Sequence, residues 1–423
     1  MLTLRSCRLL GAAAPVDVVL DRGLVEAIGP VGSGRGELVD ADGRWLLPGF
    51  VDEHVHFRLW AEVSRRLDVS AATSAADVAR IVGGALATSP GPVAGALAAS
   101  AGPVGGAPST SAGPIIAAGF RDGLWPDSPH KAVLDAVTRD TPVYVVSGDL
   151  HACWLNSAAL AAVGRADHPT GLLKEQDCFD VLGAVARVPD SVADTWVAEA
   201  ARQAAARGTT GIVDFDLEGA LADWARREAA GGCCLRVECG VYHDALDTAV
   251  AQGLATGQAP GAGQVTVGPL KIISDGSLNT RTAWCFDPYP GLTGPTAWGV
   301  DSVPPAELED LVRRGWAAGL VPAVHAIGDR ANAQALDAFA AVGRGGRIEH
   351  AQLLRREDVP RFAELQVTAS VQPEHALDDR DVADRHWAGR TDRAFPFRDL
   401  LDAGATLALG SDAPVAVLDP WVA

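Results

Sequence analysis

Long apolar runs and paired cysteines are both missing from this sequence. No stretch of about 20 residues is continuously apolar, so we expect no membrane span. The N-terminus has no apolar core behind a basic segment, so we expect no signal peptide either. The seven cysteines show no CxxC spacing, which favours buried thiols in a reducing cytoplasm over a disulfide framework.

Positive charge is scarce as well. The chain has 35 lysines and arginines against 53 aspartates and glutamates, with a net charge of −18 and a pI near 4.9. Such a chain repels phosphate backbones and anionic lipids, which argues against nucleic-acid binding and membrane attachment. The partners that we expect are a small-molecule substrate and a second copy of the chain in a homodimer.

Lysine is the rarest of the charged residues. Only three of the 35 basic residues are lysines, at Lys131, Lys174 and Lys271. In a chain that uses arginine almost everywhere, we expect a lysine where the chemistry needs a primary amine. Chance is enough to explain the presence of two of the three lysines.

What is present is an ordinary globular balance, with 48% hydrophobic residues over 423 positions. That length allows one large domain and a smaller companion. Residues 1–48 contain short, partly alternating apolar stretches between Gly and Asp turns, which predict a few small strands that need a partner sheet.

Residues from about 60 to 190 give a mixed signal, which we interpret as an insertion that covers a site. Within it, residues 91–114 are rich in Gly, Ala, Pro and Ser and predict a mobile loop or linker. Two apolar runs, 114–120 and 142–147, predict strands.

Beyond residue 190 the pattern becomes regular. The predicted strands are 50–56 and, after the insertion, 211–215, 235–241, 265–274, 320–325, 347–350, 367–371 and 406–410. Helical runs separate several of them, including 306–318, 331–342 and 357–365. Ser191 and Asp194 are spaced like a capping pair at the start of another helix. Alternating strands and helices imply a parallel sheet, and eight strands predict a (β/α)8 barrel over residues 49–423, with a doubly wound open sheet as the alternative.

Metal-compatible residues end five of the predicted strands. They are His54 and His56, Lys271, His325, His350 and Asp412. In a (β/α)8 barrel the active site lies at the carboxyl ends of the strands, so these residues would meet at one mouth. Two histidines that stand two positions apart in a strand point the same way, and paired imidazoles suit a divalent transition metal. The alternative for each residue is an ordinary rim side chain.

Seven stretches resemble the amidohydrolase superfamily, most closely its YtcJ-like branch, which includes N-substituted formamide deformylases. They are LLPGFVDEHVHF, SGDLHACWLNSAAL, LKIISDGSLNTRTA, AVHAIGDRANAQALDAF, RIEHAQLL, SVQPEHALDDR and LALGSDAPVAVLDP. The resemblance implies a metal-bearing barrel and a small β-sandwich that combines N-terminal strands, here in residues 1–48, with strands from the C-terminus. The chain stops at Ala423, so we expect that sandwich to be incomplete and the chain to be a fragment, a truncated gene model or a compromised protein.

The resemblance also implies a set of metal ligands. His54 and His56 would hold the first ion together with Asp412, and His325 and His350 would hold the second. The cofactor that we expect is one or two divalent ions, zinc by preference.

Lys271 would bridge the ions as a carbamate, formed from its neutral amine and CO2. An amine reacts in this way only where burial beside cations disfavours its ammonium form. The alternative is a plain ammonium, paired with an acid such as Asp275, in a site with one metal.

The same resemblance implies a reaction. Metal-activated water would attack a carbonyl that the second metal polarises, and Asp412 would accept the proton of the water and deliver it to the leaving nitrogen. We therefore predict hydrolysis of a non-peptide, amide-type C–N bond in a small N-acyl or N-formyl compound. The alternatives are a metal-dependent isomerase or ester hydrolase on the same site, and a catalytically silent, truncated scaffold.

Three further residues, His151, Arg281 and Gln372, are predicted to bind substrate. His151 and Asn156 belong to a stretch that resembles a substrate-pocket motif of the family, and His151 would bind the carbonyl oxygen. Arg281 and Gln372 stand near strand ends. By contrast, His375 and His386 lie in a polar stretch after the seventh strand, and we expect them on the surface.

Overall fold

The N-terminal residues form a small sheet. This computed structural model describes residues 1–88, 114–185, 188–216 and 219–422, and it separates into two compact units, Met1–Phe50 and Val51–Ala423. The strands of the first unit are β1 (Leu2–Cys7), β2 (Val16–Asp21), β3 (Leu24–Pro30) and β4 (Glu37–Asp40). They pair in the order β3-β2-β1-β4, and only the pair β1–β4 is parallel. The expected small strands are therefore present, as one mixed sheet.

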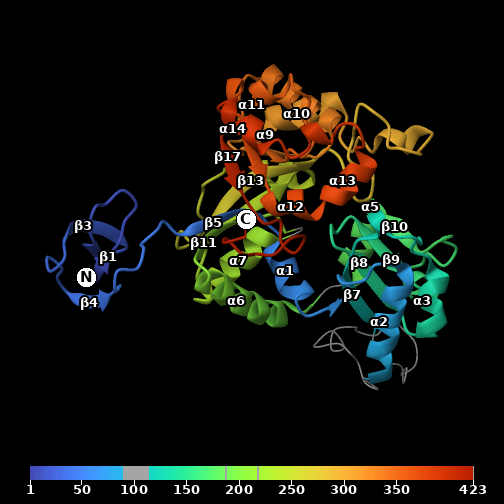
Figure 1. The fold of residues 1–423 in the computed structure, drawn as a ribbon, viewed down its shortest axis with the longest axis horizontal. Helices are drawn as coiled ribbons and strands as arrows, with labels where there is room; N and C mark the ends of the chain where they lie inside the picture. Colours follow the sequence, from blue (N-terminus) through green and yellow to red (C-terminus); the bar gives the residue numbers. More distant parts are fainter. Residues whose placement is uncertain (89–113, 186–187, 217–218, 423) are drawn as a thin grey trace. The chain divides into compact units, whose positions relative to one another are not determined.

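Eight parallel strands form a nearly closed barrel in the second unit (Figure 1). They are β5 (Phe50–Val55), β11 (Thr209–Asp214), β12 (Arg236–Tyr242), β13 (Val265–Ile273), β14 (Pro322–Ala326), β15 (Arg347–His350), β16 (Thr368–Val371) and β17 (Leu407–Leu409). Each strand lies beside the next one in this order. This arrangement confirms the predicted (β/α)8 barrel and excludes the doubly wound open sheet.

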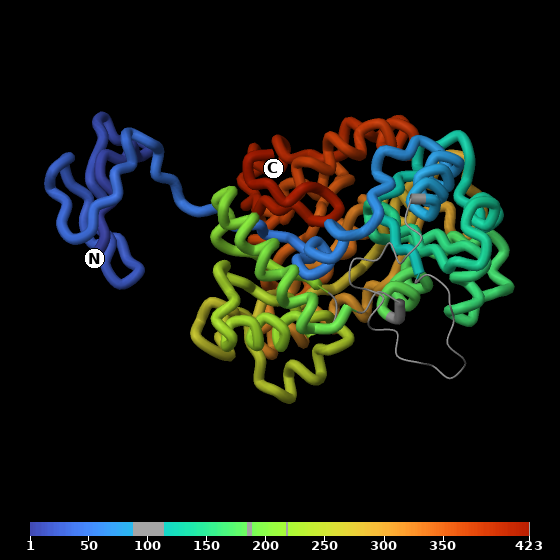
Figure 2. The backbone as a smooth tube through the Cα atoms, turned by 90° about the horizontal axis from the view of Figure 1, so that it is seen from below, coloured from blue at the N-terminus to red at the C-terminus, as the bar shows by residue number. Residues whose placement is uncertain are grey.

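The barrel closes where the first strand meets the segment after the last one. The backbone N–H of His56 donates to the carbonyl of Ala413 at 2.9 Å, and the N–H of Asp412 donates to the carbonyl of His54 at 2.7 Å. Figure 2 traces these two segments, one near the blue end of the colour scale and one at its red end. Residues more than 350 positions apart in sequence thus become neighbours across this seam.

Helices between the strands bury the outer face of the sheet. They are α6 (Asp190–Ala206), α7 (Ala220–Ala229), α8 (Leu246–Ala251), α9 (Pro305–Ala317), α10 (Asp329–Val342), α11 (Val359–Glu364) and α14 (Phe397–Asp402). Ile272 and Val324 of the strands share one core with Leu311, Phe339 and Phe362 of the helices. Burial of such side chains is worth about 1.5–3 kcal/mol each, which makes the strand ends a firm platform for a site.

The predicted capping pair at the start of α6 is wrong. The helix begins at Asp190, after Pro189, and no side chain caps it. Asp194 instead receives hydrogen bonds from Arg226 and Arg227 of α7. Ser191 and Asp194 have the spacing of a capping box, but Asp194 binds two arginines that the fold brings close and does not cap the helix.

The inserted block folds around a sheet of its own (Figure 1). Its strands are β6 (Leu67–Asp68), β7 (Ile115–Phe120), β8 (Val143–Ser147), β9 (Ala152–Leu155) and β10 (Leu172–Lys174), and its helices include α2 (Ala75–Thr88), α3 (Lys131–Thr138), α4 (Ser157–Ala162) and α5 (Gln176–Val185). Alternate residues of β8 enter two apolar cores, with Val145 in one and Val146 in the other, so both faces of the sheet are covered. Of the predicted loop 91–114, residues 91–113 lie outside the described residues.

None of the helices in the described residues is long and apolar enough to cross a bilayer. All seven cysteines are free thiols, and five of them are buried, whereas Cys233 is half-buried and Cys234 is exposed.

Candidate metal centre

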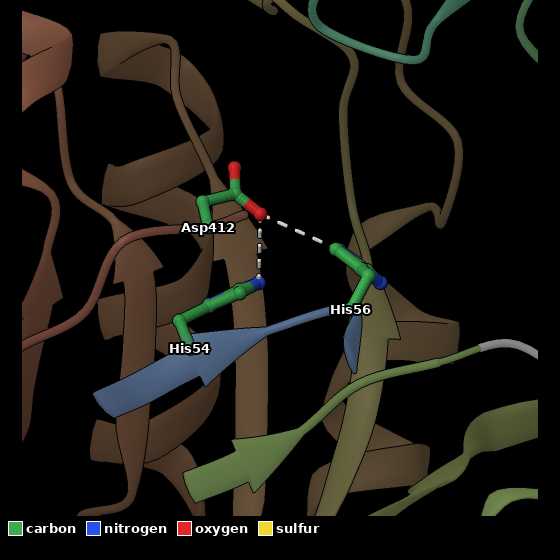
Figure 3. A group of neighbouring side chains, drawn as sticks. All are labelled: His54, His56 and Asp412. Carbon is green, nitrogen blue, oxygen red and sulfur yellow. Dashed lines mark ion pairs between the residues drawn. The ribbon is translucent and has the colours of Figure 1, made fainter. Parts of the chain in front are cut away.

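Three of the predicted ligands converge at the seam of the barrel (Figure 3). Nε2 of His54 lies 3.5 Å from Oδ1 of Asp412, and Nε2 of His56 lies 3.4 Å from the same oxygen. Two atoms that bind one tetrahedral zinc ion at about 2.0–2.1 Å are about 3.3 Å apart. The spacing of these atoms is therefore that of ligands that share an ion.

The other predicted ligands adjoin this group. Nζ of Lys271 lies 3.4 Å from Nε2 of His54. The ring of His350 lies 4.9 Å from that of His54 and 4.5 Å from that of His325. Four histidines, a lysine and an aspartate from five parts of the chain thus surround one buried point, as the strand-end pattern predicts.

Hydrogen bonds on the outer nitrogens prepare the imidazoles for a metal. Oε2 of Glu349 accepts from Nδ1 of His54 at 2.6 Å, and Oε1 of Gln372 accepts from Nδ1 of His350 at 2.8 Å. The carbonyl of Gly276 accepts from Nε2 of His325 at 3.2 Å. Each bond fixes one tautomer and leaves the second nitrogen with a free lone pair, as in protein sites where carboxylates and carbonyls orient metal-bound histidines. The residues present therefore fit a divalent transition metal.

Burial keeps these groups in the protonation states that bind metals. It lowers the pKa of His54 to about 4, and it lowers the pKa values of His325 and His350 well below their usual range. Burial alone would raise the pKa of Asp412, but the surrounding imidazoles hold it well below the usual value. At neutral pH these three histidines are neutral and the aspartate is ionised, which are the forms that coordinate cations.

Two of the site residues adopt strained backbone conformations. His350 has φ = 78° and Asp412 has φ = 57°, in the left-handed region that non-glycine residues rarely occupy. Such residues cost about 1–3 kcal/mol each and cluster at functional sites. Each lies where its strand ends and the chain turns, which aims the side chain into the mouth of the barrel.

Comparison with known proteins agrees with this site. The model of the amidohydrolase family matches residues 37–423. Over 418 residues the chain is 30% identical to the putative amidohydrolase YtcJ of Bacillus subtilis, a match that spans 92% of this chain and 74% of that protein. The chain belongs to the amidohydrolase family.

Two further proteins share less of their sequence with this amidohydrolase. The N-substituted formamide deformylase of Arthrobacter pascens is 24% identical over 450 residues, covering 95% of this chain and 78% of the deformylase. A crystal structure of an uncharacterised metal-dependent hydrolase from Pyrococcus horikoshii superimposes with a TM-score of 0.77 at 24% identity, covering 100% of this chain and 84% of that one, and shows the same fold. Family membership together with the His/Asp cluster makes this chain a metal-dependent hydrolase.

In this amidohydrolase, the predicted substrate contact His151 lies beside His325, one of the predicted ligands. Its ring lies 5.8 Å from the ring of His325, and its Nδ1 pairs with Oε2 of Glu175 at 2.8 Å. Burial lowers the pKa of His151, but Glu175 and Asp149 outweigh that effect and raise it to about 9. His151 is thus an imidazolium at neutral pH, beside neutral imidazoles.

The remaining predicted contacts differ in position. The side chain of Gln372 binds Nδ1 of His350, so it orients a predicted ligand. Arg281 lies in the loop after β13, close enough to Asp122 and Lys174 to influence their pKa values, and its role as a substrate contact stays a prediction. Asn156 is buried and caps α4 through a hydrogen bond from Ala159, which is a structural task.

The expectation for His375 and His386 is wrong, because both side chains are buried. The polar stretch that contains them forms two short helices, α12 (Pro373–Asp378) and α13 (Arg380–His386). His375 lies in the ligand cluster, with its Nε2 3.7 Å from Oδ2 of Asp412. The histidine in SVQPEH, one of the family-like stretches, was the signal that could have identified it.

Proposed function

We propose that this amidohydrolase cleaves an amide-type C–N bond, other than a peptide bond, in a small N-acyl or N-formyl compound. The observation that carries the proposal is the convergence of His54, His56 and Asp412 at 3.4–3.5 Å. The names of the formamide deformylase and the putative amidohydrolase among the relatives support the class of bond. Zinc suits this set of nitrogen and oxygen donors.

His54, His56 and Asp412 would hold one ion, and His325 and His350 would hold a second. A bound divalent ion supplies an activated water at neutral pH and polarises the acyl oxygen. Asp412 takes the proton of the attacking water and delivers it to the leaving nitrogen, because an ionised carboxylate at this point is ready to act as a base.

Lys271 acts as a carbamate in this proposal. Burial lowers the pKa of its amine to about 8, so a fraction of the amine is neutral at pH 7 and can add CO2 with loss of a proton. The alternative partner is engaged elsewhere, since Asp275 accepts backbone N–H groups from Trp284, Ile327 and Gly328. A carbamate would place two oxygens next to Nε2 of His54.

His151 binds the substrate through a charged N–H. Its pairing with Glu175 keeps the imidazolium oriented, and Thr282 in turn donates to Glu175 at 2.6 Å. A fixed cation in a buried mouth attracts the oxygen atoms of an acyl compound. The inserted block thereby contributes directly to the proposed site.

The test combines metal analysis with a panel of N-formyl and N-acetyl amines and the matching esters. The wild type is expected to bind one or two zinc-like ions per chain and to hydrolyse amides faster than esters. Asp412→Asn should lower kcat by at least about 100-fold, the usual contribution of acid–base catalysis. Asp402→Asn, at an exposed position on α14, is the matched control. Full activity of Asp412→Asn, or a metal-free wild type that retains activity, would refute the proposal.

A further inference from the structure

His375 lies beside the reacting groups with one nitrogen unused. It is 5% exposed, and its ring stacks on that of His350 at 6.2 Å and 8°. Its Nε2 has no hydrogen-bond partner within the described residues, although it lies 3.7 Å from Oδ2 of Asp412. A buried polar group left unpaired costs about 1–3 kcal/mol. The nitrogen is therefore arranged for an atom that the chain itself does not provide.

The contact of Nδ1 of His375 indicates which kind of atom its Nε2 would bind. The side-chain amide nitrogen of Gln352 lies 3.2 Å from Nδ1 of His375, and an amide N–H that donates there places a ring proton on Nε2. The arrangement at His350 is the reverse, because Gln372 accepts from Nδ1 and leaves a lone pair on Nε2. His350 thus has the form of a metal ligand, whereas His375 has the form of a hydrogen-bond donor.

The distance between the two side chains allows a bridging atom. The 3.7 Å between His375 and Asp412 exceeds a direct hydrogen bond, which needs about 2.7–3.2 Å. It is only slightly longer than the spacing of about 3.3 Å for two ligands of one zinc ion, and with His350 these residues form a second group that could hold an ion, so the tautomer of His375 distinguishes the two roles. A third atom, bound to both side chains, satisfies the two groups.

We propose that His375 is a catalytic residue, which donates a hydrogen bond from Nε2–H to the acyl oxygen of the substrate beside Asp412. This inference rests on the proposed amide hydrolysis. The acyl oxygen gains negative charge as the tetrahedral intermediate forms, so a donor already in place stabilises the transition state more than the substrate. His375 neither gains nor loses a proton, since Asp412 carries out the proton transfer. His151, which contacts His325 rather than Asp412, then binds another part of the substrate.

The experiment uses the metal-loaded, full-length protein with His375→Leu and His375→Gln. Leucine removes the donor, while glutamine returns an amide N–H close to the position of Nε2. With N-formyl- and N-acetyl-4-nitroaniline as probes, His375→Leu should lower kcat by about 10²–10³-fold with a smaller change in KM, as for the loss of one oxyanion donor. His375→Gln should recover at least tenfold of that loss. Metal content should equal that of the wild type in both variants.

Two outcomes would overturn the inference. Loss of one metal ion per chain in both variants would make His375 a ligand, and wild-type kcat in His375→Leu would make it a packing residue. Long-range ¹⁵N NMR of labelled histidine adds a readout that needs no turnover: the signal absent from His375→Gln should report the Nε2–H tautomer, and an Nδ1–H tautomer would refute the donor role. Should the wild type hydrolyse none of the substrates, the proposed function fails, while the tautomer still decides whether His375 is a donor.

Discussion

His54 depends on an acid 295 positions away in sequence. Oε2 of Glu349 accepts from Nδ1 of His54 at 2.6 Å, and Oε1 of Glu349 accepts from Arg347 at 2.9 Å. Burial alone would raise the pKa of Glu349, but Arg347 and His54 hold it below its usual range. The carboxylate therefore stays ionised and keeps the lone pair of His54 on Nε2, the nitrogen that adjoins Asp412.

Replacing Glu349 should weaken metal binding without removing a ligand. In Glu349→Gln the amide can present an N–H to Nδ1 and favour the wrong tautomer, so we expect zinc affinity to fall about 10–100-fold. Competition with a chromophoric chelator measures this change. Glu53→Gln is the matched control, because the Glu53 side chain also binds Arg347, at 2.8 Å, whereas Glu349 is the acid that binds Nδ1 of His54. Equal affinities in the wild type and Glu349→Gln would refute this role of the acid.

The convergence of the strand-end residues could be predicted from the sequence, whereas the burial of His375 and the pairing of Glu349 with His54 were not predicted. His54, His325 and Asp412 end recognisable apolar strands, and strand ends meet in any barrel of this type. The positions of Glu349 and His375 at the site depend on barrel closure and on the packing of α12. A polar stretch such as SVQPEHALDDR carries no periodicity that reveals a buried imidazole.

At the scale of elements, the inserted sheet is joined to the barrel by a chain of polar side chains. Ser277, in the loop after β13, donates to Asp149 at 2.8 Å, and Thr282 of the same loop donates to Glu175 at 2.6 Å. Asp149 and Glu175 both belong to the inserted block, and Glu175 pairs with His151. The sequence correctly predicted two strands of this block, at 114–120 and 142–147. It did not predict the polar connections to the barrel, because these join residues more than 100 positions apart.

The pair of His151 and Glu175 should make stability depend on pH. The pKa of His151 is raised from 6.5 to about 9, so its stabilisation is complete below pH 6.5 and disappears as pH rises to about 9. Burial alone would raise the pKa of Glu175, but the attraction of His151 outweighs burial and lowers this pKa from 4.5 to about 2. The stabilisation by Glu175 is therefore complete above pH 4.5 and is lost as the pH falls towards 2. In metal-depleted protein, the Tm difference between wild type and Glu175→Gln should be largest between pH 4.5 and 6.5 and shrink towards pH 9.

The control for this measurement is Glu199→Gln, which removes an exposed ion pair with Arg65. Its Tm difference from the wild type should be small and constant over the same range, because exposed pairs contribute about 0–1 kcal/mol. A Glu175→Gln difference that stays constant up to pH 9 would show that His151 is neutral in the folded protein.

At the scale of the whole barrel, the proposed ligands of the first metal come from the two ends of the sheet. His54 and His56 belong to the first strand and the residue after it, while Asp412 follows the last strand. Only a few backbone hydrogen bonds close the barrel here, including those between His54 and Asp412 and between His56 and Ala413. An ion bound to both sides would join the ends of the sheet, so metal binding and closure of the barrel should be linked.

This linkage predicts that metal stabilises the fold of the barrel. An ion that binds only the folded state adds RT ln(1 + [L]/Kd), about 4 kcal/mol at a thousandfold excess over Kd. Chelator-treated protein should therefore unfold at a lower temperature, and buffered zinc should raise Tm progressively. Mg²⁺ at the same free concentration should change Tm little, because it prefers oxygen ligands and gives up its waters reluctantly. His56→Gln removes one ligand from the seam and should reduce the dependence on zinc; a wild-type Tm that does not respond to zinc would mean that no ion joins the first and last strands.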